Sequence, residues 1–173
     1  MYQHNHAIKQ VVQEIMADEM NRVYTEEGIE PLFVAPSTAK ILLVGQAPGR
    51  LAQESRQTFN DPSGDRLRSW LGVSREVFYE SGKFGIVPMD FYFPGKAKTG
   101  DNPPRKLLAL MPDIELIILI GAYSQKYYLG KQRKRTLTET VRHYQEYLPK
   151  FLPLVHPSPL NIRWMKRNPW FEE

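Results

Sequence analysis

Four short apolar runs, separated by stretches of helical pattern, constrain the fold of this chain most strongly. They cover residues 41–44, 84–87, 116–120 and 151–155. Continuous apolar runs of this length are typical of strands buried on both faces, and helical crossovers between strands favour parallel pairing. We therefore predict an α/β fold with three αβα layers around a central, mostly parallel four-stranded sheet.

The segments between these runs carry helix signals. Residues 6–20 repeat apolar side chains at helical spacing, and Ser63 and Ser74 are predicted to cap helices that end at Leu71 and Tyr79. Further helices are predicted at 121–129 and 136–147. The chain has 173 residues and contains no segment of linker composition. We expect one domain over residues 1–173, with residues 1–38 forming a helix and loop that pack on it.

The composition excludes several classes of protein. The chain has no cysteine, which excludes disulfides and cysteine-bound zinc or iron–sulfur centres and fits a reducing compartment. No apolar run approaches the roughly 20 residues of a membrane-spanning helix, and no secretory signal is visible. We expect a cytoplasmic monomer without a cofactor. The formal net charge of +4 permits an anionic partner without identifying one.

The loops that follow the predicted strands are the candidate ligand site, because parallel sheets bind ligands at the carboxyl ends of their strands. The loop after the first strand reads Gly45-Gln46-Ala47-Pro48-Gly49-Arg50, and the second strand leads into residues 88–100. The loop after the fourth strand reads His156-Pro157-Ser158-Pro159-Leu160-Asn161. Glycine lets a backbone approach a ligand closely, and proline fixes the path of a loop.

The loop of residues 45–50 after the first strand and the loop of residues 156–161 after the fourth resemble, in this order, the signature loops of the uracil-DNA glycosylase superfamily. The resemblance extends from about Lys40 to Phe171. It implies an enzyme of base-excision repair that extrudes a deaminated base from double- or single-stranded DNA and hydrolyses its bond to deoxyribose. Uracil is the leading candidate for this base. No metal or cofactor is implied. Such an enzyme needs a pocket for the base, for which the motif supplies Gly45, Ala47 and Pro48.

The resemblance also assigns roles to single residues. His156 matches the histidine that donates a hydrogen bond to the departing base, Phe59 the phenylalanine that stacks on it, and Leu160 the leucine that fills the vacated stack. Each has a plain alternative, namely a histidine that fixes its own loop, a core phenylalanine and a packed loop leucine. Contacts to DNA are expected from Ser63, Ser158, Asn161, Arg163, Lys166 and Arg167, for which a solvated basic tail is the alternative.

The sequence departs from the family pattern at the residues that perform chemistry. Family members carry Asp or Glu in the first motif, whereas this chain has Gln46 and Ala47, so Gln46 can position water but cannot take its proton. We predict that Asp61 replaces the missing carboxylate, either as the general base or as the group that stabilises the positively charged sugar. Its alternative role is to begin the next helix. The family reads uracil with an Asn on the second strand. None stands in residues 86–91, so Asp90 or the backbone around Pro88 must read the base, or the substrate is not uracil.

Three functions remain open from the sequence. The first is a DNA glycosylase. The second is a nucleic-acid or nucleotide-binding module that kept the fold and lost catalysis, which the substitutions at Gln46 and Ala47 favour. The third is a hydrolase of free nucleosides, which would act without DNA and with little dependence on salt.

Overall fold

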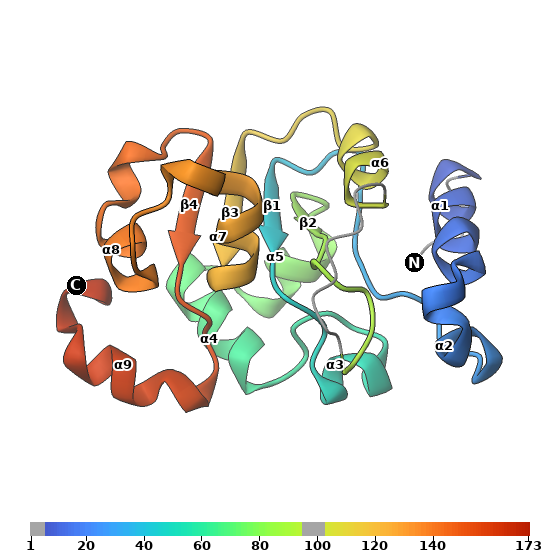
Figure 1. Ribbon diagram of the computed structural model, residues 1–173, viewed down its shortest axis with the longest axis horizontal. Coiled ribbons are helices and arrows are strands. Elements are labelled where there is room, and N and C mark those ends of the chain that lie inside the picture. The colour runs from blue at the N-terminus through green and yellow to red at the C-terminus, as the bar shows by residue number, and fades with distance from the viewer. Residues whose placement is uncertain (1–5, 95–102) are drawn as a thin grey trace.

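The computed structural model describes residues 6–94 and 103–173; the second half of the 88–100 loop lies outside the described residues. Its sheet contains β1 (Ile41–Val44), β2 (Phe84–Ile86), β3 (Leu116–Ile120) and β4 (Phe151–Leu154). The strand order is β2-β1-β3-β4, and every pair is parallel (Figure 1). The predicted α/β fold is confirmed, and its sheet is parallel throughout these four strands.

The strand order fixes where a ligand can bind. From β1 the chain crosses to β2 on one side, and then returns to β3 on the other side of β1, where Leu43 pairs with Ile118. The loops after β1 and β3 therefore leave the sheet in opposite directions. This reversal creates a crevice at the carboxyl ends of the strands.

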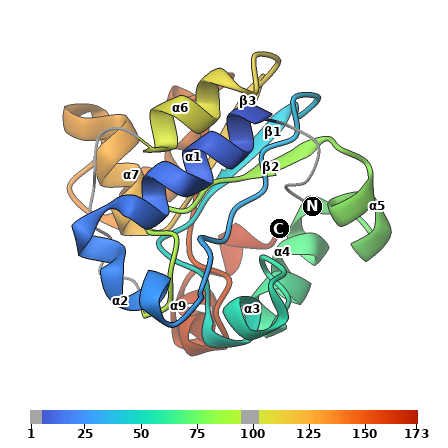
Figure 2. The same cartoon turned by 90° about the vertical axis from the view of Figure 1, so that its right-hand side faces the viewer.

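Helices cover both faces of the sheet. One face packs Leu42, Val44 and Leu119 against α1 (His6–Ala17), α6 (Pro103–Ala109) and α7 (Ala122–Leu129). The other face packs Leu43 and Ile118 against α4 (Pro62–Leu71) and α5 (Arg75–Glu80). Figure 2 shows these layers on opposite sides of the strands. Alternate residues of β1 face alternate layers, which explains why its apolar run is unbroken.

The described residues contain four more α-helices: α2 (Arg22–Glu26), α3 (Arg50–Ser55), α8 (Leu137–Arg142) and α9 (Ile162–Arg167). Single 3-10 turns follow α1, α7, α8 and α9, and another precedes α9. Among residues 6–94 and 103–173, no helix is both long and apolar enough to cross a membrane.

The helix boundaries correct three predictions and confirm one. The helix predicted over residues 6–20 ends at Ala17, and a 3-10 turn over Glu19–Asn21 follows. The cap of α4 is Asp61 rather than Ser63, because the Asp61 carboxylate accepts a hydrogen bond from the Gly64 N–H at 2.8 Å. The helix predicted over residues 136–147 ends at Arg142 and continues as a 3-10 turn over Tyr144–Glu146. Ser74 does cap α5, since its hydroxyl accepts a hydrogen bond from the Val77 N–H.

Candidate active site

A cavity of about 140 Å³ lies at the carboxyl edge of the sheet. Most of its lining comes from the loop after β1, the segment before α4 and the loops after β2 and β4. The lining residues are Leu32, Gly45, Ala47, Pro48, Gly49, Thr58, Phe59, Asp61, Ser63, Ile86, Pro88 and His156. The structure thus brings together seven residues that the sequence predicted from separate loops: Gly45, Ala47, Pro48, Phe59, Asp61, Ser63 and His156.

His156 directly follows the apolar run of β4, and the two prolines after it restrict its loop. Its Nδ1 accepts a hydrogen bond from the Ser158 backbone N–H at 3.1 Å. The neutral ring therefore carries its proton on Nε2, which is a donor. Burial lowers the pKa of His156, against a smaller opposing influence of the Asp61 carboxylate. A half-buried, neutral imidazole donor results.

Phe59 holds an unusual backbone conformation. Its φ is +54°, in the left-handed region that costs a bulky residue on the order of 1–3 kcal/mol and that occurs often at functional sites. The bend brings its carbonyl against α4, where a side chain on Gly64 would put Cβ 1.7 Å from the Phe59 oxygen. Only glycine fits there. The ring is half-buried and meets Phe78 edge to face at 6.4 Å.

Asp61 belongs both to a helix and to the cavity. Its Oδ1 caps α4, and its Oδ2 lies 3.1 Å from the position that a Cβ on Gly49 would occupy. It is the one carboxylate among the described residues that line the cavity. From the sequence, capping a helix and taking part in catalysis were alternative roles for Asp61. This geometry permits the same carboxylate to do both.

The loops after β1 and β2 are joined through their backbones. The Met89 N–H donates to the Gly45 carbonyl at 2.9 Å, and the Asp90 N–H donates to the Gln46 carbonyl at 2.8 Å.

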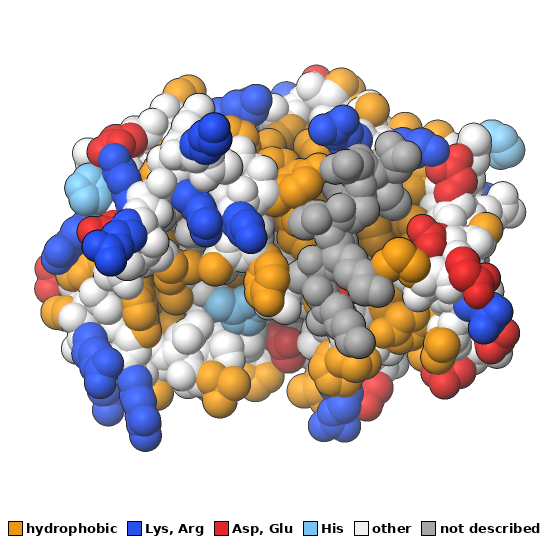
Figure 3. All heavy atoms as spheres, viewed as in Figure 1, with side chains coloured by type: hydrophobic (Ala, Val, Ile, Leu, Met, Phe, Trp, Pro, Cys, Tyr) orange, Lys and Arg blue, Asp and Glu red, His pale blue; other side chains and the backbone are white. Residues whose placement is uncertain are grey.

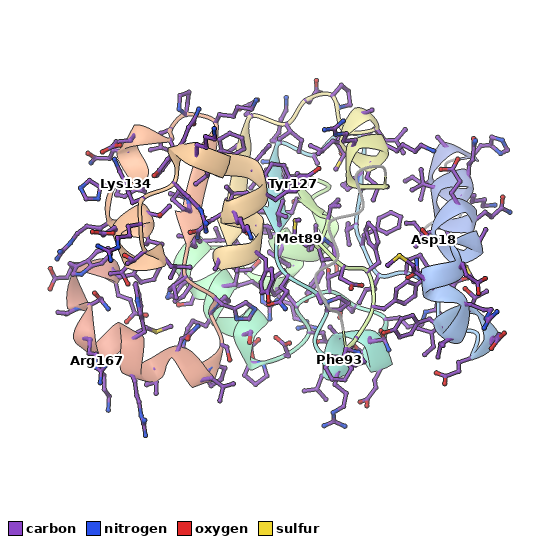
Figure 4. The ribbon with its side chains drawn as sticks, in the orientation of Figure 1. Asp18, Met89, Phe93, Tyr127, Lys134 and Arg167 are labelled. Atoms are coloured by element: carbon purple, nitrogen blue, oxygen red, sulfur yellow. The ribbon has the colours of Figure 1, made fainter. Side chains whose placement is uncertain are left out.

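Gln46 and Asp90 are not among the lining residues, and Asp90 Oδ1 accepts a hydrogen bond from the Tyr92 N–H. Figure 4 shows Phe93 beside α3, where its N–H donates to Gln53. Pro88, which lines the cavity, has no N–H to offer a base.

Thr58 is a lining residue that sequence reasoning missed. Its side chain is buried, and Oγ1 has no hydrogen-bond partner among the described residues. A buried hydroxyl without a partner is rare in native proteins. No local pattern around Thr58 predicts that it lines the cavity.

Apart from Ser63, the predicted DNA-contacting residues follow His156 in the sequence, on the loop after β4 and on α9. The side chain of Leu160 is 91% exposed, and the Ser158 hydroxyl accepts a hydrogen bond from its N–H. The Asn161 side chain donates to the His156 carbonyl at 2.8 Å, so it fixes the loop internally. Arg163 and Lys166 are exposed on α9. Figure 4 shows Arg167 at the outer end of that helix, far from α1.

Charge is unevenly distributed along the chain. Residues 121–173 contain ten Lys and Arg against four Asp and Glu, whereas residues 6–38 contain two against six. Figure 3 shows the basic side chains gathering over the end that carries α8 and α9, and acidic ones over α1 and α2. Within the described residues, no group of three His, Cys, Asp or Glu could hold a metal ion.

Fold and cavity define an α/β domain with a cavity at the carboxyl edge of a parallel sheet. The family model described as Uracil DNA glycosylase superfamily matches residues 31–173. The chain belongs to this superfamily, and the resemblance of its two loops is confirmed.

Proposed function

We propose that this protein is a DNA glycosylase that hydrolyses the N-glycosidic bond of an everted, deaminated base, uracil first, in base-excision repair. One observation carries the proposal: Phe59, Asp61 and His156 surround a single cavity. They supply an aromatic ring, a carboxylate and a half-buried hydrogen-bond donor. Membership of the superfamily supports DNA as the partner. The cytoplasmic location and the monomeric state stay predictions.

The size of the cavity favours a base with one ring. Its volume is about 140 Å³, and an apolar protein cavity of about 150 Å³ accommodates benzene. A pyrimidine has a ring of the same size. Ile86, Pro48 and Phe59 provide apolar surface for the faces of the ring, and the polar side chains of the lining are those of Thr58, Asp61, Ser63 and His156. Uracil therefore fits better than hypoxanthine or xanthine.

The reaction follows from the charges that develop. When the bond between C1′ and the base breaks, its electron pair goes to the base, and the sugar becomes positive. The Nε2–H of His156 donates a hydrogen bond to the base oxygen that gains charge, a contribution of about 2.7–4 kcal/mol for such a donor. The Asp61 carboxylate stabilises the positive sugar. Water then bonds to C1′ and loses a proton to Asp61, which leaves an abasic sugar and the base as its anion. The anion takes up a proton from solvent and Asp61 releases one, so the carboxylate is restored.

The rim supports the extrusion of the base. Flipping costs a few kcal/mol, and apolar side chains that fill the vacated stack offset part of this cost. Leu160 is exposed on the loop that begins with His156 and is suited to this role. Arg163 and Lys166 would contact phosphates, which position the duplex without reading its sequence.

The proposal is tested with oligonucleotides that contain uracil, hypoxanthine or xanthine, each single- and double-stranded, with undamaged DNA as the blank. We expect abasic sites on uracil, and a loss of roughly 100- to 1000-fold in rate for His156→Ala. The control is His143→Ala, which changes an exposed histidine whose ring contacts the Glu139 carbonyl on α8.

Two other results would assign a different function. Tight binding of DNA without abasic sites, even at high enzyme concentration, would establish the binding module that Gln46 and Ala47 favour. Hydrolysis of free nucleosides with little dependence on salt would establish the nucleoside hydrolase.

A further inference from the structure

Arg68 is a charged side chain inside the protein, where the residue is only 5% exposed. A guanidinium is costly to bury unless its donors are satisfied. Its Nη1 lies 3.1 Å from both the Phe59 carbonyl and the Tyr79 hydroxyl, and Nη2 donates to Asp65 at 2.6 Å. The guanidinium also lies 5.4 Å from the ring centres of Phe78 and Tyr79. Burial removes Arg68 from any direct contact with DNA phosphates.

Tyr79 continues this network to the next carbonyl. Its hydroxyl accepts a hydrogen bond from Arg68 and donates one to the Thr58 carbonyl at 2.7 Å. Burial raises the pKa of Tyr79, so the hydroxyl keeps the proton that it donates. Arg68 and Tyr79 thus hold two consecutive carbonyls, one on each side of the bend at Phe59.

This bend is unfavourable for phenylalanine and must be held by its surroundings. Its φ of +54° lies where glycine is preferred. The carbonyls of Thr58 and Phe59 belong to the two peptide groups that flank its Cα, so fixing both carbonyls fixes the direction of the Cα–Cβ bond from which the ring extends. A second arginine supports the same segment, because Arg75 donates to the side chains of Gln57 and Asn60 at 2.8 and 2.7 Å.

We propose that Arg68 and Tyr79 are positioning residues, which hold the Phe59 ring at the angle needed to stack on an extruded base. The catalytic consequence rests on the proposed function, but the positioning of the segment does not. A merely structural role would lower stability without depending on the presence of the Phe59 ring.

A double-mutant cycle separates these two roles. Tyr79→Phe removes one hydroxyl and leaves the ring, so it is the mildest change to the network. Its matched control is Tyr147→Phe, which removes a hydroxyl that likewise donates to a backbone carbonyl, that of Gln132 at 3.1 Å, and that does not line the cavity. The Phe59→Leu variant provides the second background. Single-turnover excision of uracil and the Tm are measured for each protein.

Tyr79→Phe should slow excision by roughly 10- to 100-fold in the wild-type background, the scale of a small misplacement of a binding group. In the Phe59→Leu background it should slow excision less than about 2-fold, because the group that it positions is gone. Tyr147→Phe should lower the Tm comparably and leave the excision rate unchanged. Equal losses in both backgrounds, or a loss no greater than that of Tyr147→Phe, would overturn the proposal.

Hydrogen–deuterium exchange tests the positioning independently of excision. Amides of residues 57–61 should exchange faster in Tyr79→Phe than in the wild type, and at the wild-type rate in Tyr147→Phe. Unchanged exchange in Tyr79→Phe would refute the positioning itself. If the wild type excises no base while Tyr79→Phe exchanges faster, the glycosylase proposal fails and the positioning of Phe59 stands.

Discussion

The Ser158 backbone N–H donates a hydrogen bond to Nδ1 of His156 at 3.1 Å. A residue two positions further along the same loop therefore decides which nitrogen of the imidazole carries the proton. A ring that takes a second proton must lose this bond, because Nδ1 can no longer accept. This relationship makes the protonation of His156 measurable in both stability and activity.

We expect the protein to become less stable as the pH is lowered, because His156 is then protonated. Burial lowers its pKa in the folded state, so the unfolded chain takes up this proton first as the pH drops. The stability contributed by the neutral ring is complete above the ordinary pKa of 6.5 and is lost progressively below it. Thermal unfolding from about pH 8 to pH 5 should show a smaller decrease in Tm for His156→Gln than for the wild type. His143→Gln should retain the wild-type decrease; a decrease identical in all three proteins would contradict the assignment.

Asp61→Asn separates the two uses of this side chain. Asparagine also caps helices, so the free energy of unfolding should change by less than about 0.5 kcal/mol. Excision should fall by about 100-fold or more, because the amide neither stabilises a cation nor accepts a proton. Asp61→Ala should lose about 1 kcal/mol in addition, with the cap. Denaturant unfolding and single-turnover rates measure both quantities, and full activity in Asp61→Asn would rule out a catalytic role for the charge.

Thr58→Val should stabilise the protein. The buried hydroxyl has no partner among the described residues, so replacing it with a methyl group removes a desolvation penalty of about 1–3 kcal/mol. The matched control is Thr140→Val, also a buried threonine, whose hydroxyl donates to the Thr136 carbonyl and accepts from the Lys134 N–H. That variant should be destabilised. A lower free energy of unfolding for Thr58→Val, measured by denaturant titration, would show that its hydroxyl has a partner.

The double variant Arg163→Gln, Lys166→Gln should weaken binding to all DNA sequences alike. Each lost phosphate contact reduces the slope of log K against log salt by about one. Lys9→Gln changes an exposed lysine on α1, in the acidic part of the chain, and should leave the slope unchanged. Fluorescence anisotropy at several salt concentrations gives the slopes. Equal slopes in the three proteins would show that α9 makes no contact with DNA phosphates.

The sheet was predictable because its strands pack against apolar layers on both faces and therefore stand out as unbroken apolar runs. The cavity loops were predictable because parallel strands deliver their following loops to one edge. Helix α9 carried no clear period, since its two less exposed residues, Trp164 and Met165, are adjacent. Asp61 and Ser63 are both good capping residues, and only the hydrogen bond to Gly64 decides between them.

The supports of Phe59 could not be predicted from sequence. Arg68 would be expected on a solvent-exposed face of α4, since arginine is seldom fully buried. Its burial depends on Tyr79 of the next helix and on the carbonyl of Phe59, and no local pattern encodes these contacts. The same holds for Thr58, because no local pattern predicts that its buried hydroxyl has no hydrogen-bond partner among the described residues.

The unequal placement of charge along the chain gives the molecule an electric polarity. A polyanion attracts the end that carries α9 and repels the end that carries α1 and α2, so approaching molecules are turned before they touch. Collisions in the wrong orientation become rarer, and a charge distribution of this kind raises the rate at which a protein associates with an anionic partner.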